Sequence, residues 1–454
     1  MTIIIKRSLH LLKNRGLLRY YSNINVPFQD DLSDIDLDDF GLSDFKHYKE
    51  STDVIEQRKK LYQSISEEVA NEQPITSLES IASAKEPSIY ISKLTDPYIN
   101  LSIEDYIYNK MPLSTNFNSE RLMFYTNSPC VVIGKNQNPW KEVNLPVLNS
   151  LGYPLIRRKS GGGTVVHDLG NVNFSFMTTK QKFDRFKFVN LVVDSINQSG
   201  VAKKIEVNKR GDIVTIDQNQ EFKISGSAYK LSKGKSYHHS TMLLNSNLKN
   251  LSKILHRDER KLGVVEAKNS IASVKSKVTN LEIDSDKFIK IVSNEFKQEY
   301  GINEQTVKEE ESEEVKEFDE FNEMMGLTDF INSIKTANVF EINSSTQLPQ
   351  EVIDTSEELK NWNWKFGHTP IFNHYLLNDK LGLKLKFYVE KGKIVQIDWE
   401  LEKPNNELQS VLKNFEKGAA GKECRGDLIK ESLGSDDELS KDLGKWLSKS
   451  IDGL

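Results

Sequence analysis

The sequence predicts an α/β or α+β protein, and three features support that prediction. Short strand-like segments alternate with a smaller number of helical segments between residues 88 and 300. A later stretch, 383–399, has the alternating pattern of a β-hairpin. A chain of 454 residues, 37% of them hydrophobic, is long enough for more than one domain.

Hydrophobic periodicity predicts the elements of the first half. Ser88–Ser92 alternates as a strand does, and apolar residues at near-helical spacing predict a helix over Asn100–Met111. A further helix is expected between Trp140 and Leu148. Runs of β-branched and aromatic residues predict strands at 122–125, 130–134, 153–156, 164–166 and 172–176.

The second half continues the mixed pattern. Helices are predicted over 183–202 and Asp284–Tyr300, and strands over 204–207, Phe222–Tyr229 and Tyr237–Leu244. A dense acidic run at about 304–338 is interpreted as an insertion or a separate helix. From residue 349 a second, smaller unit is expected, with the hairpin followed by helices to residue 454.

A glycine triplet between two predicted strands is the strongest candidate for a ligand site. Residues 157–168 read RRKSGGGTVVHD. Glycine allows positive φ and close backbone approach, successive N–H groups can cradle an anion, and Arg158 offers a fork of donors suited to phosphate or carboxylate. The spacing fits neither a P-loop nor a dinucleotide fingerprint. A flexible turn is the alternative interpretation, and the flanking strands make the two about equally good.

Two further clusters carry possible chemistry. Lys223 lies in a segment of small residues, although a solvated strand lysine is the ordinary interpretation. Asp212 lies beside basic residues and is a reasonable Mg²⁺ ligand where phosphates supply the remaining oxygens. His238 and His239 are adjacent, so on a strand they point to opposite faces and do not share a metal ion.

The composition restricts location and partners. Residues 1–21 hold five basic residues, no acid and an apolar face, which is typical of a mitochondrial transit peptide, with a basic surface helix as the alternative. Two distant cysteines indicate a reducing compartment. No apolar run is long enough to span a membrane, and a net charge of −5 without a basic stripe disfavours nucleic acid as a partner.

Five motifs in order resemble the lipoate–protein ligase A family. The glycine segment extended to Asn171 resembles its signature, as does Lys223–Tyr229 followed by the two histidines. Segments 136–142 and 273–281 agree, and 364–372 is similar to the start of the small C-terminal domain of bacterial two-domain members. The resemblance covers roughly residues 88 to 454, apart from the acidic insertion.

The resemblance implies a biotin/lipoate-ligase-like catalytic domain with mixed sheets flanked by helices, and a small α/β accessory domain. It implies that lipoate and Mg·ATP give lipoyl-AMP, and that a lysine of an acceptor protein then takes the lipoyl group. The acceptors implied are the lipoyl domains of 2-oxoacid dehydrogenase E2 subunits and the glycine-cleavage H protein. Octanoate is a possible substitute for lipoate, a monomer is expected, and the mitochondrial matrix is the expected location.

Residue roles follow from the same resemblance. Lys223 is expected to bridge the lipoate carboxyl group and the α-phosphate as the catalytic residue. The nucleotide or adenylate would contact Lys223 and Asp212, together with Arg158, Gly161, Gly162, Gly163, Thr164, Val165 and Val166. Besides Lys223, the lipoate pocket would use Glu104, Ser160, His167 and His239.

The chain departs from the family pattern beside the presumed metal site, where Gly211 replaces an asparagine. In addition, Lys275 and Lys277 replace arginines that are usual in bacterial members. Bidentate phosphate contacts would be lost at those lysines. An ATP-independent lipoyl or octanoyl transferase that uses a thioester or a lipoylated carrier is therefore an alternative. An inactive acyl-binding assembly factor is a third.

The predicted domain organisation has four parts. A transit peptide occupies 1–21 and an acidic, disordered linker 22–86. The catalytic domain spans 87–348 and contains the acidic insertion, and the accessory domain spans 349–454.

Overall fold

The computed structural model describes residues 77–113, 119–303, 335–434 and 437–454. The predicted transit peptide and almost all of the predicted linker and acidic insertion lie outside these ranges. The described part begins inside the predicted linker, because α4 (Leu78–Ala82) is a helical turn that buries all three of its apolar side chains. The linker boundary predicted at residue 86 is therefore too late.

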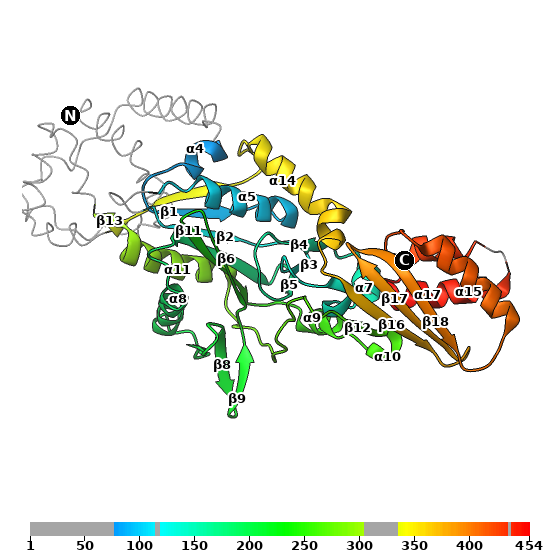
Figure 1. The fold of residues 1–454 in the computed structure, drawn as a ribbon. Coiled ribbons are helices and arrows are strands. Elements are labelled where there is room, and N and C mark those ends of the chain that lie inside the picture. Colours follow the sequence, from blue (N-terminus) through cyan, green and yellow to red (C-terminus); the bar gives the residue numbers. More distant parts are fainter. Residues whose placement is uncertain (1–76, 114–118, 304–334, 435–436) are drawn as a thin grey trace, which may run out of the picture. The chain divides into compact units, whose positions relative to one another are not determined.

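A six-stranded mixed sheet forms the centre of the region before residue 349 (Figure 1). β1 pairs in parallel with both β2 and β15, whereas β2–β6, β6–β11 and β10–β11 are antiparallel. The strands, in spatial order, are β10 (Ser227–Ser232), β11 (Lys235–Leu243), β6 (Asn171–Thr179), β2 (Arg121–Tyr125), β1 (Ser88–Ser92) and β15 (Asn338–Ile342). This arrangement confirms the predicted mixed α/β class.

Helices cover both faces of this sheet, because its strands carry apolar side chains on both faces. Successive strand side chains point to opposite faces, so Leu122 joins one hydrophobic core and Met123 the other. On the first face lie α8 (Lys187–Gln198) and α11 (Ser285–Tyr300), and on the second lie α5 (Pro97–Lys110) and α14 (Gln350–Lys360). Each buried Phe, Leu or Val contributes roughly 1.5–3 kcal/mol to these contacts.

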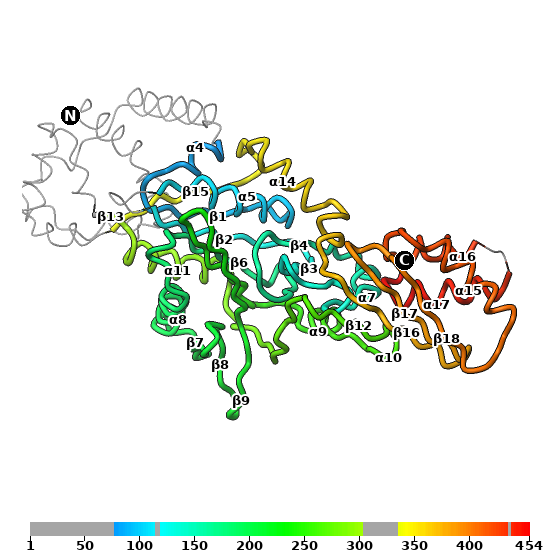
Figure 2. Tube along the Cα trace, viewed as in Figure 1, coloured from blue at the N-terminus to red at the C-terminus, as the bar shows by residue number. Residues whose placement is uncertain are grey.

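Two small sheets carry the candidate site residues. One consists of β4 (Leu155–Arg157), β3 (Cys130–Ile133) and β5 (Val165–His167). The other consists of β7 (Glu206–Val207), β8 (Ile213–Asp217) and β9 (Gln220–Lys223), and the β8–β9 hairpin projects from the body (Figure 2). The glycine segment therefore connects strands of one sheet, whereas Lys223 ends a strand of another.

The prediction of one strand over 222–229 is wrong. Lys223 ends β9, and its backbone exchanges hydrogen bonds with Lys277 O (2.8 Å) and Thr279 N (3.0 Å). The chain then turns at Gly226 and enters β10 of the central sheet. The alternating pattern of residues continues across this corner, so nothing in the sequence indicates that one strand ends and another begins there.

The C-terminal part has its own sheet and three helices. The predicted hairpin is present as β17 (Leu383–Glu390) and β18 (Lys393–Leu401), beside β16 (Phe372–Asn378) and β12 (Val264–Glu266). The helices are α15 (Asn406–Ala419), α16 (Gly426–Leu433) and α17 (Glu438–Ile451).

The predicted domain boundary at 349 does not divide the structure cleanly. Val352 and Leu359 of α14 belong to the core beneath α5, although they follow that boundary. Conversely, β12 precedes it and joins the C-terminal sheet. Trp140 packs against Phe372, with ring centroids 5.0 Å apart, so one core continues from the region before residue 349 into the C-terminal part.

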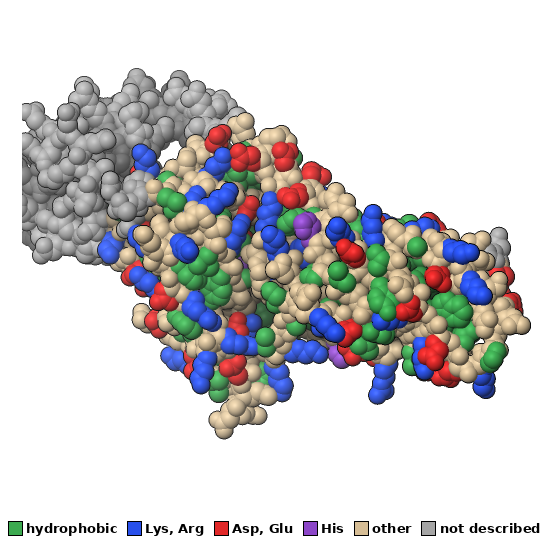
Figure 3. All heavy atoms as spheres, viewed as in Figure 1, with side chains coloured by type: hydrophobic (Ala, Val, Ile, Leu, Met, Phe, Trp, Pro, Cys, Tyr) green, Lys and Arg blue, Asp and Glu red, His purple; other side chains and the backbone are tan. Residues whose placement is uncertain are grey.

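The remaining short elements are α6 (Pro139–Glu142), α7 (Leu145–Ser150), α9 (Leu248–Leu255), α10 (Glu259–Leu262), β13 (Ile302–Asn303), β14 (Lys335–Thr336) and the π-helical turn η4 (Asn363–Gly367). In the part of the chain that is described, every helix is too short or too polar to cross a membrane. On the face drawn in Figure 3, basic and acidic side chains lie side by side.

Candidate active site

The glycine segment is a closed loop between β4 and β5. Arg158 lies beneath it, and its guanidinium donates to Gly161 O (2.6 and 3.0 Å), Gly163 O (2.8 Å) and Val132 O (3.3 Å). Burial lowers the pKa of Arg158 to about 10. The predicted phosphate fork is thus used to hold the loop, and a phosphate would have to replace some of these carbonyls.

Gly162 occupies a position where only glycine fits. Its φ is +96°, and a Cβ there would lie 2.6 Å from Arg158 Nη2 and 2.9 Å from Ala228 Cβ. Gly161 is different, because a Cβ at that position would meet nothing within 4 Å. The structure of the loop therefore requires glycine at position 162, whereas at position 161 there is space for a side chain.

A second segment, around Ser273, holds the loop by hydrogen bonds. Ser273 Oγ accepts from Thr164 N and from Gln137 Nε2, each at 2.9 Å. Gln137 Oε1 accepts in turn from Gly134 N (2.8 Å) and Thr164 Oγ1 (3.0 Å). Thr164 is a predicted nucleotide contact, but its backbone N–H is already occupied by Ser273, and sequence reasoning missed the role of Gln137.

Arg157 connects the loop to the C-terminal part. Its guanidinium is fully buried and donates to backbone carbonyls of Trp364 and Lys365 at 3.1 and 2.9 Å and to Thr369 Oγ1 at 2.8 Å. Trp364 Nε1 donates back to Arg157 O at 2.7 Å. Although the two arginines are adjacent, Arg157 joins two parts of the chain and Arg158 shapes the loop.

Three predicted pocket residues form a buried cluster with Tyr125, next to β11. Glu104 Oε1 lies 3.1 Å from His239 Nδ1 and accepts from Tyr125 OH at 3.3 Å. His167 is fully buried, and burial, followed by the charges of His239 and Arg158, lowers its pKa to about 3. Ser160 is also buried in the loop. We call Glu104, Tyr125, His167 and His239 the buried cluster.

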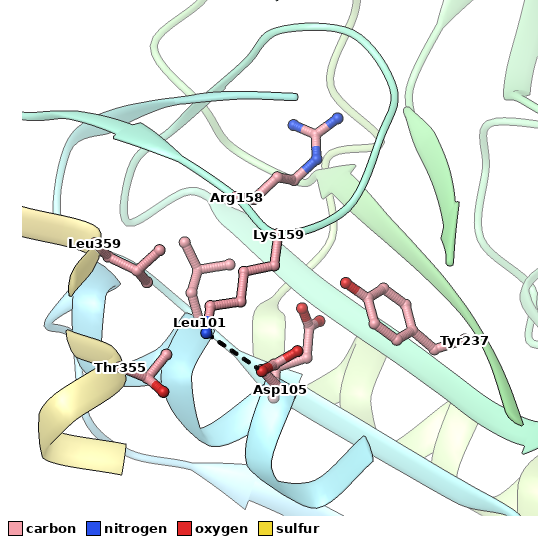
Figure 4. Close-up of a pocket in the computed structure, with 8 residues that line it drawn as sticks. Leu101, Asp105, Arg158, Lys159, Tyr237, Thr355 and Leu359 are labelled. Carbon is pink, nitrogen blue, oxygen red and sulfur yellow. Dashed lines mark ion pairs between the residues drawn. The ribbon is translucent and has the colours of Figure 1, made fainter. Parts of the chain in front are cut away.

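A pocket opens next to this cluster between α5, α14 and the loop (Figure 4). Lys159 and Asp105 face each other across it at 3.7 Å, and Lys159 also pairs with Glu358 at 3.0 Å. Burial raises the pKa of the Tyr237 phenol in its wall well above the usual value. The full lining is Leu101, Glu104, Asp105, Arg158, Lys159, Tyr237, Thr355 and Leu359.

The predicted catalytic lysine belongs to a different, charged group, which we call the lysine cluster: Arg210, Asp212 and Lys223. Lys223 Nζ lies 2.9 Å from Asp212 Oδ1, and Arg210 Nη2 lies 3.0 Å from Asp212 Oδ2. The Lys223 side chain is 23% exposed. Gly226 leaves room beside it, since a Cβ there would lie 3.5 Å from Lys223 Nζ.

Asp212 was the predicted magnesium ligand, and both of its oxygens are paired with cations. Within the described ranges, no group of three or more His, Cys, Asp or Glu side chains is placed to hold a metal ion. Asp212 therefore fits Mg²⁺ only as a single protein ligand beside phosphate oxygens.

Most predicted residues meet in one region, with one exception. Ala228 lies beneath Gly162 and follows Lys223 by one short corner, so the loop and the lysine cluster adjoin. His239 pairs with Ala228 across β10 and β11, which brings in the buried cluster. Val166, however, lies in the core shared with the C-terminal part, because adjacent residues of β5 point to opposite faces. Only Val165 is left on the side of the pocket.

Comparison with known proteins gives consistent matches. Residues 96–298 match the family described as lipoyl protein ligase A/B catalytic domain. A Saccharomyces cerevisiae protein (strain S288c) named as a proposed lipoate-protein ligase A is 36% identical over 384 residues, 83% of this chain and 84% of that protein. A Schizosaccharomyces pombe protein with the same name is 30% identical over 372 residues, covering 80% and 93%. The crystal structure of P. falciparum LipL1 in complex with lipoate has 22% identity and a TM-score of 0.45, covering 80% of this chain and 99% of that one.

Proposed function

This chain belongs to the lipoate–protein ligase A family, and we propose that it is an ATP-dependent ligase that attaches lipoyl groups to protein lysines. The observation that carries the proposal is the position of Lys223. Its side chain is partly exposed, its ammonium is held by Asp212 at 2.9 Å, and it adjoins the glycine loop through Gly226 and Ala228. A fixed cation beside an anion-binding loop suits a reaction that brings two anions together.

In the first step a lipoate carboxylate oxygen attacks the α-phosphorus of ATP, and pyrophosphate leaves. Lys223 would lie between the carboxylate and the α-phosphate and offset their repulsion. In the second step the neutral amine of an acceptor lysine attacks the acyl carbon of lipoyl-AMP. The amide C–N bond forms, the C–O bond to AMP breaks, AMP leaves with that electron pair, and the amine loses a proton.

Substrates and partners follow the family. Lipoate is the proposed acyl substrate, with octanoate as a second, and Mg²⁺ would accompany ATP and neutralise phosphate charge. Asp212 is the residue we propose to face that ion. The proposed acceptors are lipoyl domains of 2-oxoacid dehydrogenase E2 subunits and the glycine-cleavage H protein.

A specific observation favours a second candidate, acyl transfer from a thioester without ATP. Gly211 has a φ of +82°, and a Cβ there would lie 3.0 Å from Tyr229 OH, so the family's asparagine side chain would be strained in this conformation. Lys277, which replaces an arginine, donates to Gln220 Oε1 at 2.9 Å. The differences at Gly211 and Lys277 concern the proposed nucleotide contacts, whereas the catalytic residue that we propose, Lys223, is kept.

Intact-mass measurement of a purified lipoyl domain separates the two candidates. One reaction contains lipoate and Mg·ATP, and the other contains octanoyl-CoA without nucleotide. The proposed ligase shifts the acceptor mass in the first reaction. A shift in the second reaction alone would establish the transferase, and no shift in either would favour the inactive assembly factor.

We also propose delivery to the mitochondrial matrix, on the composition of residues 1–21. A fusion of residues 1–30 to a fluorescent reporter should enter mitochondria. A diffuse cytosolic signal would contradict this part of the proposal.

A further inference from the structure

His167 holds a buried nitrogen that nothing described in the structure satisfies. The side chain is fully buried, and Nδ1 lies 3.0 Å from Asn127 Nδ2. Within the described ranges, Nε2 has no hydrogen-bond partner. A buried polar atom without a partner costs about 1–3 kcal/mol, so a retained one needs a reason.

The hydrogen bonds around it determine which nitrogen carries the proton. Asn100 Nδ2 contacts the backbone carbonyls of Leu94 (2.8 Å) and Thr126 (3.3 Å), which only accept, so this end of the amide is its NH₂. That NH₂ donates to Asn127 Oδ1 at 2.9 Å. The NH₂ of Asn127 therefore faces His167 Nδ1. Because an amide NH₂ only donates, Nδ1 accepts, and the proton of the neutral ring is on Nε2.

At the other end of this hydrogen-bond chain, the side-chain amide oxygen of Asn100 also has a partner. Ser92 Oγ donates to Asn100 Oδ1 at 2.7 Å, so both ends of that amide are satisfied. Asn100 and Asn127 are fully buried. Neither amide can flip without placing an NH₂ against a donor or a C=O against a carbonyl, so the arrangement is strongly specified.

His167 belongs to the buried cluster, and Glu104 of that cluster lines the pocket in which the acyl ligand is proposed to bind. The charges of Arg158 and His239 both act on its ring, and each belongs to the glycine loop or the buried cluster. The ring is neutral, so its single N–H is available without the cost of a buried charge.

We propose that Asn127, itself held by Asn100, is a positioning residue that fixes His167 as the Nε2–H tautomer, so that His167 donates one hydrogen bond to an acceptor atom of the bound acyl substrate. The proposal rests on the proposed function, because it needs an acyl ligand in this pocket. A lipoyl group offers acceptors of two kinds, its carboxyl oxygens and its ring sulfurs. Octanoate offers only the oxygens.

The tautomer can be measured without any activity. Long-range ¹H–¹⁵N correlation spectra of the full chain labelled with ¹⁵N-histidine report which ring nitrogen is protonated. The chain has eight histidines, and the His167→Gln protein identifies the signal of His167. We expect Nε2–H in the wild type at neutral pH. A wild-type ring protonated on Nδ1 would overturn the proposal, even if the protein proves to be an active ligase.

Asn127→Asp tests the positioning role at almost unchanged volume. The carboxylate still accepts from Asn100 but presents a second acceptor to Nδ1, which must then take the proton. We expect kcat/KM for lipoate to fall by about tenfold or more, mainly through KM, as the loss of one buried hydrogen bond implies. If both ring nitrogens are protonated, Nε2–H is kept and kcat/KM should stay within about twofold of the wild type.

Two comparisons separate this role from a structural one. The exposed Asn405 caps α15, a function that aspartate also performs, so Asn405→Asp is the matched control and should behave as the wild type. In the His167→Gln background, Asn127→Asp should have no further effect on kcat/KM. An equal loss in that background would show that Asn127 does not act through His167 and would overturn the proposal.

The choice of acyl acid identifies the acceptor atom. A loss with both lipoate and octanoate assigns the hydrogen bond to a carboxyl oxygen, and a loss with lipoate alone assigns it to a ring sulfur. If Nε2 loses its proton and neither substrate is affected, the proposal is wrong. If the wild type transfers no acyl group from any donor, the proposed function fails, while the tautomer spectrum still stands as a separate result.

Discussion

The buried cluster and the lysine cluster lie close together but are built on different principles. Glu104, Tyr125 and His239 are enclosed by the central sheet and α5, and they are joined by hydrogen bonds between buried groups. Lys223 and Arg210 hold Asp212 by ion pairs at the base of a projecting hairpin and remain partly exposed. The first region is organised before any ligand arrives, and the second keeps exchangeable charge contacts.

This difference fits the two substrates that we propose, an acyl acid and a nucleotide. An acyl chain gains free energy from burial, so a dry pocket of fixed polar groups can bind it and fix its orientation. A nucleotide and an acceptor lysine both have to enter and leave, so the charged side of the site has to stay open. Arg157 links the loop between the two regions to η4, so the C-terminal part contributes to the site's rigidity.

The largest expected effect is at the centre of the lysine cluster. Lys223→Ala should lower lipoylation by on the order of 100-fold or more, because the charge developed in both steps loses its cation. The measurement is acceptor mass against time. Lys384→Ala, on the exposed face of β17, is the matched control. Near-normal lipoylation by Lys223→Ala would remove its catalytic role.

The next effect tests the rigidity of the loop between the two regions. Gly162→Ala should destabilise the protein by about 1–3 kcal/mol and lower activity, because a Cβ at φ +96° meets Arg158 and Ala228. Chemical denaturation gives the free energy of unfolding. Gly161→Ala, where the space is open, should stay within about 0.5 kcal/mol of the wild type. Equal costs at both positions would contradict the closed loop.

A smaller effect is expected beside the lysine cluster. Gly211→Asn restores the residue usual in the family, yet its Cβ would lie 3.0 Å from Tyr229 OH at a φ of +82°. We expect a cost of about 1 kcal/mol in stability and no gain in ATP-dependent activity. Combining it with Tyr229→Phe should recover part of both. A gain from Gly211→Asn alone would mean that this loop rearranges freely.

The last prediction concerns pH. Burial, followed by the charge of His239, lowers the pKa of His238 from 6.5 to about 3. Below pH 6.5 this side chain therefore binds a proton in the unfolded chain but stays neutral in the folded chain. Stability should therefore fall as pH drops from 6.5 towards 3, by up to about 1.4 kcal/mol per pH unit for each such group. Thermal unfolding of His238→Gln between pH 7 and 5 should show a shallower fall than the wild type. An identical slope would contradict the buried neutral ring.

The sequence predicted the elements well and the site unevenly, for physical reasons. Alternation located β1 and β17, because every second side chain of β17 is buried, and the spacing of apolar residues located α5. The corner after Lys223 was missed because the same alternation continues across it. The different surroundings of Val165 and Val166 could not be read from the sequence, because a three-residue strand exposes its two faces to different cores.

Residues that act through long-range contacts left no local signal. Asn127 lies in a turn between two strands, and only the fold brings it to His167. Arg157 and Arg158 look equivalent in the sequence, yet one donates to η4 and the other to its own loop. Knowledge of which amides and guanidiniums face each other requires the three-dimensional arrangement.

Isotope exchange between pyrophosphate and ATP tests the central claim most directly, because it reports adenylation without an acceptor protein. If the protein is an ATP-dependent ligase, exchange should depend on lipoate and should be lost in Lys223→Ala. Absence of lipoate-dependent exchange, with transfer to a lipoyl domain still proceeding from chemically prepared lipoyl-AMP, would show that the lysine cluster supports transfer alone and would contradict ATP-dependent activation.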